Sequence, residues 1–76
     1  MEQRIKNVMA SVFSCDVSEI GENASPDTIE QWESLKHMNL IVALEEEFGV
    51  TFSEDEIVEM LNYKLIKETL KGKNIK

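Results

Sequence analysis

The stretch ESLKHMNLIVALEEEFGV, residues 33–50, has the apolar periodicity of a helix and a glycine near its end. At 100° per residue, its main apolar side chains share one face, where they can pack against a core. These side chains are Leu40, Ile41, Leu44 and Phe48, with His37 among them. Gly49 is a typical residue for ending a helix. The stretch therefore predicts a helix over residues 34–48.

This helix carries a second apolar stripe, formed by Leu35, Met38 and Val42, with Ser34 at its N-terminal end. The simplest interpretation of a serine at this place is a helix N-cap. A catalytic nucleophile is disfavoured, because no Gly-x-Ser-x-Gly elbow surrounds Ser34 and His37 lies on or beside the packing face. We therefore predict no catalytic residues and no enzyme activity.

Outside this stretch, the periodicity predicts three more helices. Apolar residues at helical spacing predict a first helix over residues 3–14. Ser53 and Glu56 form a capping-box pattern that starts a short third helix. The apolar residues of this third helix are Ile57, Met60 and Leu61. A fourth helix is built on Leu65, Ile66 and Leu70 and ends at Gly72.

Residues 15–33 lack this periodicity and are rich in turn formers, which predicts a long loop. Ser25 and Pro26 are typical of the start of a single helical turn. The apolar residues expected to pin the loop to the core are Val17, Ile20, Ile29 and Trp32. The predicted fold is all-α: one domain over residues 1–76, a small four-helix bundle with three longer helices, a short third helix and a long loop between helices one and two.

Size and charge restrict the classes of function. A chain of 76 residues buries a small core and leaves little room for an enclosed active site. Fifteen acidic and eight basic residues give a net charge of −7, which disfavours nucleic acid and anionic membranes and favours basic protein partners. The single Cys15 excludes an internal disulfide, and no metal site is predicted. No stretch has the apolar length of a signal peptide or membrane span, so we expect a cytoplasmic protein. We also expect it to be a monomer.

The stretch 33–50, followed by FSEDEI at residues 52–57, resembles the core of acyl carrier proteins. In that family, Asp-Ser-Leu opens the second helix, and this acidic helix ends in LEEEFG. The resemblance extends over essentially the whole chain. It implies that Ser34 receives a covalent phosphopantetheine arm from coenzyme A, whose thiol carries acyl groups as thioesters.

The resemblance also implies partners and a docking surface. The implied partners are a phosphopantetheinyl transferase, an acyl-loading ligase or acyltransferase, and synthase or transferase enzymes with basic docking patches. The residues of this chain that match the family's docking positions are Glu33, Leu35, Met38, Val42, Glu45 and Glu46. Acidic contacts of this kind mainly steer and orient short encounters.

Some positions depart from the family pattern. Glu33 stands where the family usually has Asp, and Lys36 and Asn39 occupy positions that are often acidic in fatty-acid carriers. These departures favour a specialised pathway, such as polyketide or surface-polysaccharide synthesis, with fatty acid synthesis kept open.

Two alternatives to an acyl carrier stay open. An aminoacyl carrier of the peptidyl or D-alanyl type is the first, although Gln31 and Trp32 stand where many peptidyl carriers have Gly-Gly. An unmodified helical module that binds partners through the Met38 stripe is the second.

Overall fold

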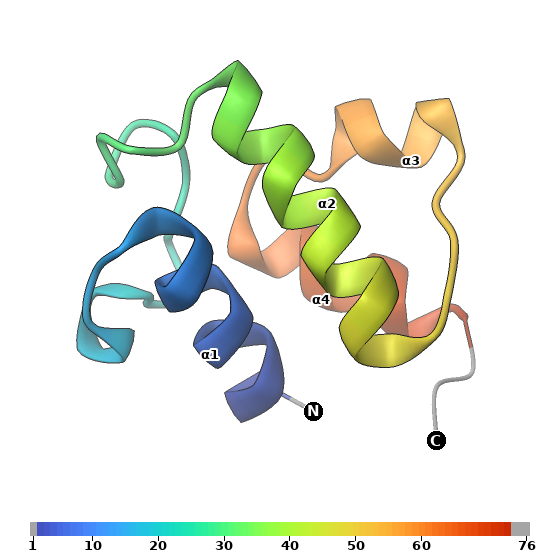
Figure 1. Cartoon of the computed structure of the whole chain (residues 1–76), viewed down its shortest axis with the longest axis horizontal. Helices are drawn as coiled ribbons and strands as arrows, with labels where there is room; N and C mark the ends of the chain where they lie inside the picture. Colours follow the sequence, from blue (N-terminus) through green and yellow to red (C-terminus); the bar gives the residue numbers. More distant parts are fainter. Residues whose placement is uncertain (1, 74–76) are drawn as a thin grey trace.

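The computed structural model describes residues 2–73, which form four α-helices and one short 3-10 helix. The elements are α1 (Glu2–Phe13), η1 (Val17–Glu19), α2 (Ser34–Phe48), α3 (Glu54–Glu59) and α4 (Tyr63–Lys71) (Figure 1). The described residues contain no strand. The prediction of a small all-α bundle with a short third helix is therefore confirmed for this part of the chain.

The helices surround one apolar core. In Figure 1, α1 and α2 lie side by side and run in opposite directions, and α4 lies behind α2. The side chains with no exposed surface come from α1, α2 and α4 and from Met60, which follows α3: Ile5, Met9, Phe13, Leu40, Leu44, Met60, Tyr63, Ile66 and Leu70. Removing such side chains from water is the main force that stabilises a bundle of this size.

The ends of α2 are fixed by local backbone geometry. Its bounds, Ser34–Phe48, are those predicted from the sequence. Gly49 follows with φ 64°, a left-handed conformation that glycine adopts without steric cost, and its N–H donates to the Glu45 carbonyl oxygen. The packing face is also confirmed, because Leu40, Ile41 and Leu44 are buried.

The third helix is shorter than its apolar residues suggested. The Ser53 and Glu56 capping box is present, as predicted. The helix ends at Glu59, however, because Met60 leaves the helical conformation with ψ 53°. Leu61 consequently lies outside the helix, and 51% of its surface is exposed.

The segment between α1 and α2 is attached to the core at the residues predicted. Ile20, Ile29 and Trp32 are buried, and the Phe13 and Trp32 rings lie 5.1 Å apart. The 3-10 helix η1 within this segment was not predicted. Its start is closed by the Asp16 backbone N–H, which donates to the Glu19 carboxylate at 3.0 Å.

Tyr63 connects three parts of the fold. Its backbone N–H donates to the Ala24 carbonyl oxygen at 2.9 Å, and its buried phenol donates to Glu2 Oε1 at 3.3 Å. Burial, followed by the negative charge and hydrogen bond of Glu2 and the charge of Glu22, raises the pKa of Tyr63 to about 12. The folded protein therefore holds this proton more tightly than the unfolded chain does.

This pKa difference predicts a loss of stability at alkaline pH. Between pH 10 and about 12 the unfolded chain binds fewer protons at Tyr63 than the folded protein, so the free energy of unfolding falls as pH rises. The full effect is at most about 3 kcal/mol. Urea unfolding across this range should show that the free energy of unfolding falls more steeply with pH for the parent than for Tyr63→Phe, which has no phenol to ionise. Equal slopes with pH would contradict the raised pKa of Tyr63.

Candidate functional site

Glu33, not Ser34, caps the start of α2. Glu33 has an extended backbone, and its carboxylate accepts hydrogen bonds from the backbone N–H groups of Lys36 at 2.9 Å and Leu35 at 3.4 Å. These are amides of the first turn, which have no partner within the helix. The interpretation of Ser34 as the N-cap is therefore wrong, because the longer Glu33 side chain already fills that role.

This arrangement leaves the Ser34 side chain free. Ser34 is the first residue of α2 and is exposed, and its hydroxyl takes part in none of the hydrogen bonds formed within residues 2–73. A pocket of about 260 Å³ opens beside it, lined by Pro26, Trp32, Glu33, Ser34, His37 and Leu61. The positive end of the α2 dipole also favours a negatively charged group at this place.

His37 uses both ring nitrogens in structural contacts. The Trp32 Nε1–H donates to His37 Nδ1 at 3.0 Å, and His37 Nε2 lies 2.9 Å from the Ile57 carbonyl oxygen. An indole N–H can only donate and a carbonyl oxygen can only accept, so the ring is neutral and carries its proton on Nε2. Neither nitrogen is left to take a proton from Ser34. The prediction that His37 is not a catalytic base is thus supported by its contacts.

The lone cysteine is held as a thiol. Cys15 is partly buried, and its pKa is raised by burial first and then by the charges of Glu19 and Asp16. A thiol with a raised pKa is a weak nucleophile at neutral pH, because the thiolate is the reactive form.

Residues 2–73 contain no group of three His, Cys, Asp or Glu side chains placed to hold a metal ion. Over the same range, the helices are too short and too polar for any of them to cross a membrane.

The apolar stripe predicted on α2 is open to solvent. Leu35, Met38 and Val42 expose 67%, 49% and 52% of their surfaces, so the loop does not cover them.

Sequence reasoning missed a further set of exposed apolar side chains on α3, after it and on α4: Val58, Leu61 and Leu65. Leu61 lies beside Ser34, because both line the same pocket. Helical periodicity could not reveal this contact, which depends on where α3 ends.

The structure separates the two acidic residues that were predicted to dock partners. Glu45 is half-buried, and its Oε2 accepts a hydrogen bond from the Phe52 N–H at 2.9 Å, so it holds the segment between α2 and α3. Glu46 is exposed and lines a groove between α1 and α2. Of the two carboxylates, Glu46 is the one more available to a partner.

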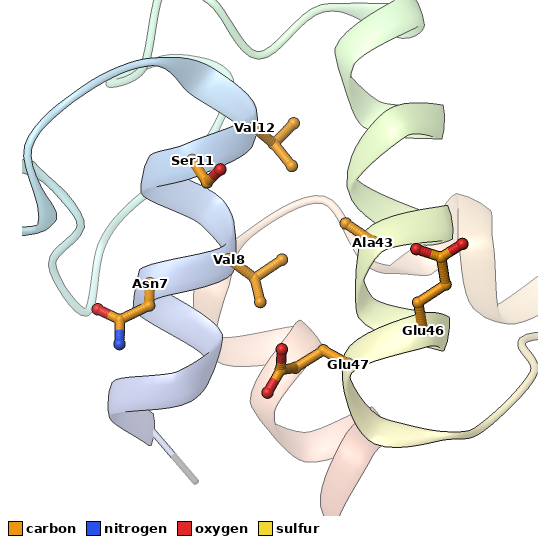
Figure 2. A pocket seen from close by; sticks show the side chains of 7 residues that line it. All are labelled: Asn7, Val8, Ser11, Val12, Ala43, Glu46 and Glu47. Atoms are coloured by element: carbon orange, nitrogen blue, oxygen red, sulfur yellow. The ribbon is translucent and has the colours of Figure 1, made fainter.

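Figure 2 shows this groove, which has a volume of about 400 Å³. Val8 and Val12 point from α1 toward Ala43, and Glu46 and Glu47 extend from α2. The Arg4 guanidinium donates to Glu47 Oε2 at 3.0 Å and to the Glu47 backbone oxygen at 2.8 Å. The groove lies along the C-terminal half of α2 and is separate from the Ser34 pocket.

The different contacts of Glu45 and Glu46 predict different effects on stability. We expect Glu45→Ala to lower the free energy of unfolding by about 1–3 kcal/mol, because the half-buried Phe52 N–H loses its charged acceptor. Glu46→Ala should change it by less than about 0.5 kcal/mol. Urea denaturation of the two variants tests this, and similar losses in both would show that the Glu45 contact contributes nothing.

Comparison with known protein families shows which family this chain belongs to. The family model described as phosphopantetheine attachment site matches residues 3–69. The match extends from α1 into α4 and includes every residue that lines the Ser34 pocket. Proteins of that family carry a covalently attached phosphopantetheine group and are not catalysts themselves.

Proposed function

Since the chain belongs to the family of phosphopantetheine-dependent carrier proteins, we propose that Ser34 receives the arm and that the arm carries acyl groups. The observation that carries this proposal is the exposed Ser34 hydroxyl at the start of α2, left free because Glu33 caps the helix. The family model fixes the class of cofactor, and the free hydroxyl supplies the attachment atom.

The attachment step is a phosphoryl transfer from coenzyme A. The Ser34 Oγ attacks the phosphorus next to the pantetheine, so a new P–O bond forms and the pyrophosphate bond breaks. Adenosine 3′,5′-bisphosphate leaves, and a base of the transferase takes the serine proton. The α2 N-terminus, with its positive dipole end, favours the phosphodiester that remains.

Two other serines, at the start of α3 and at a turn before α2, are less suited to this role. The Ser53 hydroxyl accepts from the Glu56 N–H at 3.2 Å, and the Ser25 hydroxyl accepts from the Asp27 N–H at 3.2 Å. Both hydroxyls therefore stabilise a turn or helix start. The Ser34 hydroxyl has no such role, which supports its assignment.

The surface around Ser34 suits short encounters with several enzymes. We propose that Leu35, Met38 and Val42 form the apolar part of the docking surface and that Glu46 steers basic patches toward it. Glu33 and Glu45 contribute charge to the same surface, although their carboxylates also hold backbone amides. The partners are a phosphopantetheinyl transferase, an acyl-loading ligase or acyltransferase, and synthase or transferase enzymes.

The charge pattern of α2 supports a specialised pathway. Lys36 and Asn39 reduce the negative potential near Ser34 relative to a fully acidic helix. A partner enzyme that docks on this less acidic part of α2 needs fewer basic residues in its docking patch. We therefore propose polyketide, surface-polysaccharide or similar biosynthesis as the setting, ahead of housekeeping fatty acid synthesis.

Intact mass tests the proposed function. Purified protein is incubated with coenzyme A, magnesium and a broad-specificity phosphopantetheinyl transferase, and the modified peptide is then mapped. We expect the mass of one arm to be added, on the peptide that contains Ser34. A folded protein that gains no arm, or an arm on a different serine, would overturn the assignment.

A further inference from the structure

His37 joins three segments that meet around Ser34. It lies in the first turn of α2, and its Nδ1 accepts from Trp32, which precedes the helix by two residues. Its Nε2 donates to the carbonyl oxygen of Ile57, twenty residues away on α3. The ring thus fixes the segment before α2 and the end of α3 relative to each other.

We infer that His37 is a positioning residue for the modification of Ser34: the neutral ring holds Trp32 and the end of α3 so that the pocket beside the serine keeps its shape. This inference rests on the proposed function. It is distinct from a catalytic role, because His37 makes its contacts to Trp32 and Ile57 and not to the reacting hydroxyl.

The pocket walls depend on these two contacts. Trp32 forms one wall and is adjacent to Glu33, the cap of α2. Leu61 forms another wall and follows closely after Ile57, whose carbonyl oxygen His37 holds. If the ring loses its hydrogen bond to Trp32 or to Ile57, the pocket wall formed by Trp32 or by Leu61 is no longer fixed beside Ser34. A transferase that must bring coenzyme A to this hydroxyl then meets a less defined surface.

The neutral form of the ring is essential to this arrangement. A proton on Nδ1 would point at the Trp32 N–H, which is also a donor, so the charged ring cannot keep this hydrogen bond. The contacts made by the ring nitrogens are the Trp32 indole and the Ile57 carbonyl, neither of which titrates. Glu33 is the other titratable side chain that lines the pocket, and its carboxylate is bound to the Lys36 and Leu35 amides.

The chain offers a clean spectroscopic probe, because it has one histidine and one tryptophan. In the apo protein, ring ¹⁵N shifts should show the neutral tautomer with its proton on Nε2. The Trp32 indole proton should exchange with water slowly in the parent and faster in His37→Leu. An Nδ1–H tautomer, or equal indole exchange in both proteins, would overturn the inference.

Transferase kinetics test the positioning role. In His37→Leu we expect kcat/KM for modification of Ser34 to fall by about tenfold or more, since poor positioning of a reacting group slows its reaction. His37→Gln is the matched variant, because an amide can accept from Trp32 and donate to Ile57, and it should recover most of the rate. Full activity in a folded His37→Leu protein would overturn the inference.

Failure of the proposed function can be told apart from failure of this inference. If neither the parent nor His37→Gln gains an arm, the proposed function has failed, while the tautomer and the indole exchange still decide whether His37 holds its two partners.

Discussion

We expect Ser34→Ala to abolish attachment of the phosphopantetheine arm and to leave the fold intact. Under the proposed function, the substitution removes the oxygen atom that would form the bond to phosphorus. It breaks no hydrogen bond within residues 2–73, because Glu33 and not Ser34 caps α2. The free energy of unfolding should therefore change by less than about 0.5 kcal/mol. Intact mass after incubation with coenzyme A and transferase measures the first effect, and urea denaturation measures the second.

Ser53→Ala is the matched control, with the opposite expected pattern. The Ser53 hydroxyl accepts the Glu56 N–H in the capping box of α3, so its loss should destabilise the protein by about 1 kcal/mol. Attachment of the arm should continue, because Ser34 is unchanged. An arm on Ser34→Ala, or its absence from a folded Ser53→Ala, would show that another serine is the attachment site.

Trp32→Ala should have the largest effect on stability. Trp32 is 3% exposed, packs 5.1 Å from the Phe13 ring and donates its indole N–H to His37. Removing a buried aromatic side chain costs about 3–5 kcal/mol. A chain of this length has a total stability of about 4–11 kcal/mol. The midpoint of thermal unfolding should therefore fall by more than about 10 °C, measured by circular dichroism.

Two variants identify the cause of this loss. Trp32→Phe keeps a ring in the core and loses the N–H donor, so its stability should lie between those of the parent and Trp32→Ala. Leu35→Ala removes an apolar side chain that is 67% exposed, and it should be nearly neutral. A loss in Leu35→Ala as large as that in Trp32→Ala would mean that burial of Trp32 is not the reason.

Local patterns predicted most of the secondary structure. The bounds of α2 follow from apolar spacing and from Gly49, which ends the helix in a left-handed conformation. The start of α3 follows from Ser53 and Glu56, whose side chains satisfy each other's backbone amides. Each of these signals acts over three or four residues, so each can be interpreted without knowing the rest of the fold.

The contacts of the candidate site could not be predicted in the same way. Either Glu33 or Ser34 can cap a helix. Glu33 is the cap because its backbone is extended, and a sequence pattern does not predict this backbone conformation. The partner of His37 on α3 is a backbone carbonyl twenty residues away. Backbone groups leave no trace in side-chain patterns, so the hydrogen bond between His37 and Ile57 becomes visible only in the folded chain.

The functional class rests on a different kind of observation. A free hydroxyl at a helix start is compatible with many functions, and the geometry of Ser34 alone does not select one. The family match over residues 3–69 gives the class of cofactor, and the structure shows that Ser34 is exposed.

The apolar side chains that stay exposed on α2, α3 and α4 are as open to a second copy of the chain as to an enzyme. At low ionic strength, a net charge of −7 makes copies repel one another before these side chains meet. Salt at about 1 M shortens the screening length to about 3 Å and removes most of this repulsion. Ionic strength should therefore act in opposite directions on two associations: it weakens attraction to basic enzymes and promotes clustering of the carrier with itself.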